Sequence, residues 1–377
     1  MKLSCLQENL KRGLAIVGHA VAGKTTLPVL SNVLLATDSG RLKIAATNLE
    51  IGITHWVGAK IDAEGAITIP AKLLSDVVSG LPNDKVTLTL DARTQTLNII
   101  CGRFETNIKG IEADEFPVIP TVADRSPSAL FPPDVLREAI DQIAFAAATD
   151  DTRPVLTGVL MRIKGTKVTF SSADGFRLAQ RTFELPEPAS DVQDLIVPAR
   201  ALSELARISG DASGPVELTV TQGGGQVLFH TENTDLVSRL IDGRYPDIER
   251  VIPQSYATRT LLETQDLVKA VKLASLFASA SANIVRITLE PGGDLGPGKV
   301  TISANAAEVG DNKGAIDGMV HGEGGQINLN VKYLADAIAA IKTPQVALET
   351  QTAQNPAVFR PVGTEGYVHI VMPMTVR

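Results

Sequence analysis

The sequence motif with the most definite chemical meaning is a glycine-containing loop that runs from Gly18 to Thr25. It fits the pattern G-x-x-x-x-G-K-[ST]. In proteins that use this pattern, backbone N–H groups surround nucleotide phosphates and the lysine, here Lys24, reaches the terminal phosphates. The loop therefore raises the hypothesis of a P-loop nucleotide-binding protein.

The residues on either side of this loop do not suit that hypothesis. A phosphate loop follows a buried strand, whereas residues 6–17 carry apolar side chains at helical spacing. Pro28 falls within the first turns of the helix that should follow, where proline removes a hydrogen bond and clashes with the backbone. We therefore keep nucleotide binding as the alternative function and expect Lys24 to lie on a polar loop.

Other residue types that carry chemistry are few and scattered. The chain has two cysteines and five histidines, which lack the spacing of a metal-ligand set. The Asp-Gly pairs at Asp174 and Asp242 are typical of turns. We expect that the protein is not an enzyme and that it binds no metal and no cofactor. The first residues contain no apolar signal core and no apolar run is long enough to span a membrane, so we expect a cytoplasmic protein.

Length and composition indicate a folded protein of two or three domains. The chain has 377 residues, of which 44% are hydrophobic and 20% charged. Lys and Arg number 35 against 42 Asp and Glu, which gives a formal net charge of −7. An acidic balance argues at first against a nucleic-acid partner, since phosphate attraction requires basic surface.

One pattern of elements occurs three times, at a period of roughly 130 residues. Each copy has an opening amphipathic helix, then a short apolar entry into a second amphipathic helix, then a strand with alternating apolar residues. The opening helices carry Leu6, Leu10, Leu14 and Val17; Leu136, Ile140, Ile143 and Ala147; and Leu267, Val271 and Ala274. The second helices with their entries cover 69–78, 197–206 and 331–338, and the strands cover 86–90, 216–220 and 346–349.

These copies predict an α+β fold of three similar domains. Period-2 alternation in the strands indicates sheets with one buried face, and the apolar helix faces would cover it. Proline and polar residues interrupt the pattern near residues 122–124 and 253–256. We therefore expect domains at 1–123, 124–253 and 254–377, each with two helices packed on an antiparallel sheet.

Short motifs along the whole chain carry a resemblance to one family, the bacterial DNA polymerase III beta subunits, or sliding clamps. The order and spacing of these motifs make the resemblance specific. They lie at residues 26–32, 47–50, 69–72, 80–82, 114–117, 152–158, 173–178, 242–247 and 371–374.

The resemblance implies that two chains form a head-to-tail homodimer that closes into a six-domain ring around double-stranded DNA. Such a ring is a processivity factor, which tethers the replicative polymerase, the clamp loader and other proteins with a clamp-binding motif. DNA binding would be independent of sequence, and the protein would be associated with the nucleoid. A scaffold of repeats that does not bind DNA remains the other interpretation of the repeats.

The resemblance places the helices around the central hole, where basic side chains would face DNA. The six predicted helices carry slightly more basic than acidic residues, although a solvated helix face explains such charges equally well. Arg153 matches a family arginine near the DNA and the pocket region. The residues expected to face DNA are Lys24, Lys72, Arg153, Arg200, Arg207, Lys11, Arg12, Lys269, Lys272 and Lys332.

The resemblance also implies an apolar groove that binds short peptides of partner proteins. Methionine and proline suit such a groove because thioethers adapt to varied partners. The other interpretation is that residues 372–374 only anchor a final strand. The expected groove residues are Leu156, Ala173, Gly175, Phe176, Arg177, Leu178, Pro246, Arg250, Val251, Ile370, Val371, Met372, Pro373 and Met374.

The contact between the two chains of the ring is the least defined site. Alignment to the family places Ile108 of one chain against Leu276 and Phe277 of the other. Leu276 and Phe277 could instead be core residues of their own helix, because their spacing fits that role.

Overall fold

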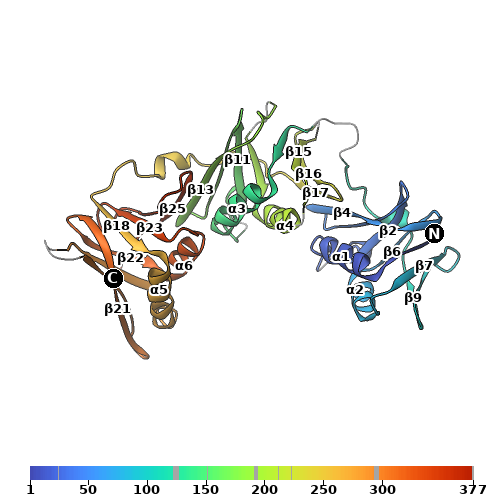
Figure 1. Ribbon diagram of the computed structural model, residues 1–377, viewed down its shortest axis with the longest axis horizontal. Helices are drawn as coiled ribbons and strands as arrows, with labels where there is room; N and C mark the ends of the chain where they lie inside the picture. The colour runs from blue at the N-terminus through green and yellow to red at the C-terminus, as the bar shows by residue number, and fades with distance from the viewer. Residues whose placement is uncertain are drawn as a thin grey trace. The chain divides into compact units, whose positions relative to one another are not determined.

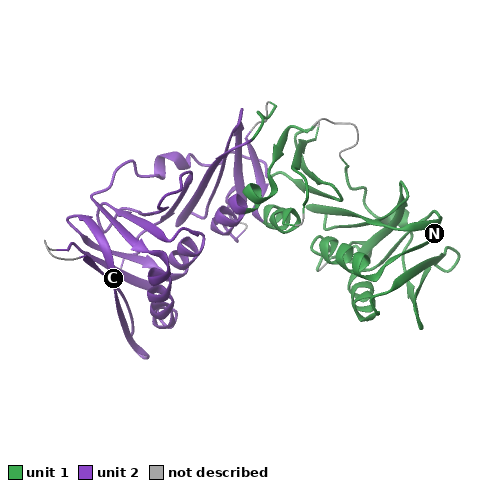
Figure 2. Cartoon of the chain, viewed as in Figure 1, with its two compact units in different colours: residues 1–137, 186–190, 200–240 green, residues 138–185, 191–199, 241–377 purple. Residues whose placement is uncertain are grey.

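The computed structural model describes residues 1–23, 25–121, 127–150, 152–190, 194–210, 212–221, 223–292 and 297–375. The chain divides into two compact units (Figure 2). Unit 1 comprises residues 1–137, 186–190 and 200–240, and unit 2 comprises residues 138–185, 191–199 and 241–377. The division therefore crosses the middle sequence repeat. The expected boundary at residues 123 and 124 lies outside the described residues.

Unit 1 contains two antiparallel sheets (Figure 1). The first has the strand order β5 (Lys60–Ala63), β1 (Lys2–Leu6), β7 (Lys85–Asp91), β8 (Thr96–Cys101) and β9 (Phe104–Lys109). The second has the order β10 (Ala129–Phe131), β15 (Val216–Val220), β16 (Gln226–Thr231), β17 (Thr234–Arg239), β4 (Ile51–Gly58), β3 (Arg41–Thr47), β2 (Asn32–Asp38) and β6 (Ala66–Pro70). Val86 and Leu88 of β7 are buried, as the alternating pattern predicts.

The helices of unit 1 follow the predicted apolar spacing with one correction. Helices α1 (Gln7–Gly18) and α2 (Ala71–Gly80) lie wholly in unit 1. Unit 1 also holds the first residues of α3 (Pro133–Ile143) and all of α4 (Ala199–Ser209) except its first residue. Helix α1 packs on α2 and β4 and buries Leu10, Leu14 and Val17. Leu6 was expected on that buried face, but it ends β1 and is exposed because the helix begins one residue later.

Unit 2 is built on one antiparallel sheet (Figure 1). Its strand order is β14 (Leu195–Pro198), β11 (Gly158–Lys164), β12 (Lys167–Ala173), β13 (Arg177–Glu184), β25 (Tyr367–Val371), β24 (Ala357–Pro361), β23 (Gln345–Thr350), β18 (Thr258–Glu263), β21 (Gly310–Gly322), β20 (Gly298–Ala306), β19 (Ile284–Glu290) and β22 (Gly325–Asn330). The pairing β13–β25 joins strands of the second and third sequence repeats.

Helices α5 (Thr264–Ala278) and α6 (Val331–Ala339) pack against each other in unit 2, which also holds the end of α3. Helix α3 ends at Ile143, so Ala147, expected on its buried face, instead follows a short 3-10 helix, although it is still buried. Among the described helices, none is both long enough and apolar enough to cross a membrane.

Two strand pairings, which we call seams, connect successive sequence repeats with the same register. In unit 1, the β4–β17 seam places Ile51 opposite Ser238. In unit 2, the β13–β25 seam places Arg177 opposite Val371. Each seam continues for one further backbone hydrogen bond beyond the strands. Arg239 N–H donates to the Glu50 carbonyl at 2.9 Å, and Met372 N–H donates to the Phe176 carbonyl at 2.8 Å.

At the other end of the β13–β25 seam, Gly366 allows a close backbone approach that a side chain would prevent. Its φ is +86°, and its carbonyl accepts a hydrogen bond from Thr182 N–H. An added Cβ would press against the Thr182 carbonyl oxygen. Gly363 has a similar φ of +84°, but a Cβ there would meet nothing within 4 Å.

We predict that Gly366→Ala destabilises the protein more than Gly363→Ala. Both variants carry the cost of a left-handed conformation, about 1–2 kcal/mol. Only Gly366→Ala adds overpacking, which typically costs about 1–3 kcal/mol. Urea denaturation of both variants measures the difference. Equal free energies of unfolding would contradict the assigned close approach.

Candidate functional site

The loop from Gly18 to Thr25 does not have the surroundings of a phosphate loop. Helix α1 precedes it where a strand is required, and a 3-10 helix at Pro28–Ser31 follows it. Lys24 lies outside the described residues. The hypothesis of P-loop nucleotide binding is therefore not supported.

Four of the residues expected in the peptide groove, Leu156, Ala173, Leu178 and Ile370, share one buried apolar cluster at the β13–β25 seam in unit 2. We call the whole expected set, which is a candidate for peptide binding, the peptide site. Its base is buried and comprises these four residues and Val371. The remaining residues are exposed or half-buried, namely Gly175, Phe176, Arg177, Pro246, Arg250, Val251, Met372, Pro373 and Met374. Phe176 is 56% exposed, an apolar side chain open to a partner.

A tight turn before β13 presents Phe176. The Asp174 carboxylate Oδ1 accepts hydrogen bonds from the backbone N–H groups of Phe176 at 2.8 Å and Arg177 at 3.0 Å. Gly175 has φ +93°, and the guanidinium of Arg153 lies 2.6 Å from where its Cβ would be. Arg153 also donates to the Asp174 carbonyl at 2.7 Å. Arg153, expected near the pocket region, therefore supports this turn.

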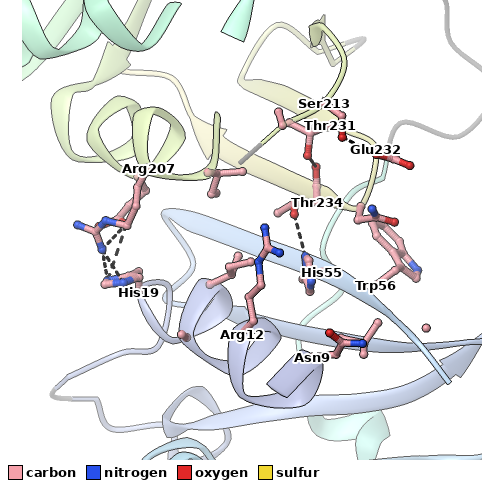
Figure 3. A pocket seen from close by; sticks show the side chains of 18 residues that line it. Asn9, Arg12, His19, His55, Trp56, Arg207, Ser213, Thr231, Glu232 and Thr234 are labelled. Carbon is pink, nitrogen blue, oxygen red and sulfur yellow. Dashed lines mark hydrogen bonds and ion pairs between the residues drawn. The ribbon is translucent and has the colours of Figure 1, made fainter. Parts of the chain in front are cut away.

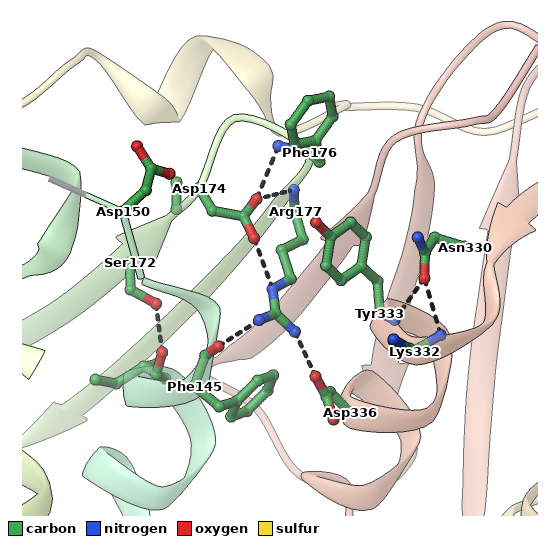
Figure 4. A network of polar contacts seen from close by, with 12 residues as sticks. Phe145, Asp150, Ser172, Asp174, Phe176, Arg177, Asn330, Lys332, Tyr333 and Asp336 are labelled. Carbon is green, nitrogen blue, oxygen red and sulfur yellow. Dashed lines mark hydrogen bonds and ion pairs between the residues drawn. The ribbon is translucent and has the colours of Figure 1, made fainter. Parts of the chain in front are cut away.

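The Arg177 side chain does not lie open in the peptide site. It is 10% exposed. It donates to the Asp174 carboxylate at 3.0 Å, to Asp336 at 2.5 Å and to the Phe145 carbonyl at 2.6 Å (Figure 4). Its guanidinium also lies 4.6 Å from the centroid of the Tyr333 ring. Arg177 thus contributes mainly by holding other groups, because its donors are occupied.

Two residues of the same apolar cluster were not expected from the sequence. Tyr245 and Ile248 are buried against the base of the peptide site. The Tyr245 hydroxyl accepts from Ala173 N–H at 3.1 Å and donates to the Gly158 carbonyl at 3.4 Å. Burial raises the pKa of Tyr245 to about 12, so it stays a neutral donor. The available signal was that Tyr245 lies beside Pro246 in the motif at residues 242–247 and that Ile248 directly follows this motif.

The basic residues expected to face DNA are exposed wherever the structure describes them. Most lie on helices: Lys11 and Arg12 on α1, Lys72 on α2, Arg200 and Arg207 on α4, Lys269 and Lys272 on α5, and Lys332 on α6. Arg153 precedes a 3-10 helix at Pro154–Thr157. Exposure on helices agrees with a DNA-facing role and does not by itself distinguish it from a solvated face.

Arg12 and Arg207 both line a cavity of about 510 Å³ within unit 1, at the β4–β17 seam (Figure 3). Arg207 donates to the His19 ring at 2.8 Å and pairs with Glu204 at 3.3 Å. Burial, and then the charge of Arg12, lower the pKa of His55 on the cavity wall to about 4. His55 is therefore neutral near pH 7, and the charged groups lie on the helices.

The residues expected at the contact between chains differ in their exposure. Leu276 on α5 is 66% exposed, so the interpretation of Leu276 as a core residue is wrong. Phe277 beside it is half-buried. Ile108 on β9 is only 3% exposed because it faces the core of its own unit. Its side chain is therefore not available to the neighbouring chain.

Comparison with known proteins agrees with this fold. Three family models match the chain: the N-terminal domain of the DNA polymerase III beta subunit at residues 1–120, its central domain at 131–247 and its C-terminal domain at 249–375. A beta sliding clamp of Synechocystis sp. is 34% identical over 99% of each chain, and that of Bacillus subtilis is 29% identical over 99% of each.

Solved structures of the same kind cover the whole chain. A DNA polymerase sliding clamp from Bacillus subtilis has a TM-score of 0.92 at 28% identity, and covers 100% of both chains. A sliding clamp from Pseudomonas aeruginosa bound to griselimycin has a TM-score of 0.89 at 29% identity, again over 100% of both chains. The protein is therefore a DNA sliding clamp with a three-domain α+β fold. It belongs to the DNA polymerase III beta subunit family.

Beneath the peptide site, a buried histidine makes stability depend on pH. His369 is 0% exposed and stacks on Phe145 with ring centroids 5.5 Å apart. Its Nδ1 lies 3.4 Å from the Tyr367 hydroxyl. Burial, and then the charge of Arg177, lower the pKa of His369 to about 3. As pH falls below about 6.5, the unfolded chain gains a proton that the folded chain cannot accept, so stability falls.

We predict that His369→Phe makes the protein less sensitive to acid. Phenylalanine keeps the stacking on Phe145 and cannot titrate. Between about pH 7 and pH 5, the wild type should lose about 2 kcal/mol more stability than the variant. Urea unfolding at the two pH values provides the measurement, with His55 common to both proteins. The same pH dependence in both would show that His369 does not titrate as assigned.

Proposed function

We propose that two copies of the chain join head to tail as a homodimer and close into a six-domain ring around duplex DNA. The continuity of backbone pairing across both seams is the observation that carries this proposal. A head-to-tail contact that extends this pairing gives a ring when the rotation closes and a filament when it does not. We retain the domains 1–123, 124–253 and 254–377, which the family-model matches support.

The contact between copies would use strand edges and the exposed face of α5. β9 is the last strand of its sheet, and Phe104 on it is 57% exposed. In β21, residues 310–317 pair with β20, whereas β18 pairs only further along the strand. Edge strands present unpaired N–H and C=O groups that can bind another chain. Leu276 would supply the apolar part of this contact. Ile108 would take part through its backbone and not through its side chain.

DNA binding would be weak and independent of sequence. Phosphate contacts from lysine and arginine position a protein without reading bases, and they weaken with salt. The exposed basic residues on the helices would supply these contacts. A ring that encloses DNA needs no tight adhesion, and it needs no catalytic group, metal or cofactor. The protein would act in the cytoplasm at the nucleoid.

The peptide site would bind clamp-binding segments of the replicative polymerase, the clamp loader and other partners. The combination of a buried aliphatic base with exposed Phe176 and half-buried Met372 favours an apolar peptide. Because the clamp of Pseudomonas aeruginosa was solved with griselimycin bound, we propose that this compound also binds the present chain, at the peptide site.

We predict that Met372→Glu weakens griselimycin binding at least tenfold, because a carboxylate would replace an apolar contact. Arg239→Glu is the matched control, since Arg239 forms the corresponding backbone hydrogen bond at the other seam. Calorimetric titration of both variants and the wild type measures the affinities. A wild-type affinity retained by Met372→Glu would place the ligand elsewhere.

We predict that the protein, once loaded by its clamp loader, is retained on nicked circular DNA and is released when the circle is cut. Enclosure explains both results, since a ring can leave only over an end. Gel filtration separates free from DNA-bound protein, and the free protein should elute at about twice the 39.9 kDa chain mass. Release from intact circles would exclude topological binding, and a monomer would exclude the ring.

A further inference from the structure

Helix α6 contacts the peptide site through the side chain of Arg177. The Asp336 carboxylate on α6 accepts from the Arg177 guanidinium at 2.5 Å, and the Tyr333 ring lies against the same group (Figure 4). The start of α6 is fixed by Asn330, whose side chain accepts from the N–H of Lys332 at 2.9 Å. Asp336 and Tyr333 thus hold the guanidinium from one side.

On its other side, Arg177 holds the turn that presents Phe176. Its Nε donates to Asp174 Oδ2 at 3.0 Å, while Asp174 Oδ1 accepts the two N–H groups of the turn. The Arg177 and Asp174 side chains are only 10% and 12% exposed. Hydrogen bonds between charged groups are strong and directional when they are shielded from water. A displacement of the Arg177 guanidinium would therefore also displace the turn that presents Phe176.

The unit 1 seam shows that such a turn folds without this connection. There, Asn48 Oδ1 accepts from the N–H groups of Glu50 at 3.0 Å and Ile51 at 2.8 Å. Ile51 begins β4 as Arg177 begins β13, so an aliphatic side chain stands where the arginine would be.

The helices facing the two seams differ in a similar way. Glu204 is the sixth residue of α4, as Asp336 is of α6, but it pairs with Arg207 of its own helix. The third residue is Ala201 in α4 and Tyr333 in α6. The link from helix to turn is therefore specific to the seam that carries the peptide site, and the fold of the turn does not require it.

We infer that Asp336 is a positioning residue for the peptide site, acting through Arg177 on the Asp174 turn and so on Phe176. This inference rests on the proposed peptide site. It adds that peptide affinity depends on a helix residue, Asp336, that need not touch the peptide. Without the Asp336 carboxylate, the Arg177 guanidinium loses one of its hydrogen-bond partners. The Asp174 turn then adopts positions in which the site does not bind the peptide.

The test compares griselimycin affinity and melting temperature across matched variants. Asp336→Asn should bind griselimycin about tenfold more weakly than wild type, with a melting temperature that changes little, since the pair is partly solvated. Asp336→Glu, which restores the charge, should regain most of the affinity. Glu204→Gln, the equivalent change on α4, should bind as the wild type does.

The outcomes separate this inference from the proposed function. If wild type does not bind griselimycin, the proposed ligand of the peptide site is wrong. If wild type binds, Met372→Glu does not, and Asp336→Asn binds normally, the positioning role is wrong and the peptide site stands. An equal loss in Glu204→Gln would also overturn the inference, because the effect would then not be specific to this seam.

Discussion

Backbone pairing between successive repeats is the interaction on which the rest of this structure depends. The β4–β17 and β13–β25 seams use the same antiparallel register and the same additional hydrogen bond beyond the strands. Such pairing satisfies the N–H and C=O groups of strands that would otherwise be edges. It turns neighbouring repeats into continuous sheets, so the helices and loops of different repeats acquire fixed neighbours within each unit.

The same backbone arrangement nevertheless carries different chemistry at the two seams. Where unit 2 has Phe176 and Met372 joined by a backbone hydrogen bond, unit 1 has Glu50 and Arg239. An apolar pair next to a buried aliphatic base favours a peptide, whereas a charged pair prefers water. The same backbone geometry therefore occurs at both seams. Only the β13–β25 seam carries the side chains of a candidate peptide site.

The sequence predicted most elements because their apolar residues follow a regular period. The expected groove residues also include four of one buried apolar cluster, Leu156, Ala173, Leu178 and Ile370, although the peptide groove itself stays a prediction. The sequence did not predict the direction in which some side chains point. Arg177 points into a polar network because the buried Asp174 carboxylate and the partly exposed Asp336 carboxylate both accept its hydrogen bonds, and Ile108 faces its own core. Neither result follows from spacing alone, because each depends on contacts between residues far apart in the chain.

The net charge of −7 is compatible with a protein that slides on DNA. Tight binding would require many phosphate contacts, and each contact held in place would oppose movement. In the proposed ring, a few exposed lysines and arginines on the helices would give attraction that salt and thermal motion can break. Acidic residues elsewhere would keep DNA from adhering to other surfaces. Retention would then come from enclosure, and an acidic chain with modestly basic helices would be better suited to that task than a basic one.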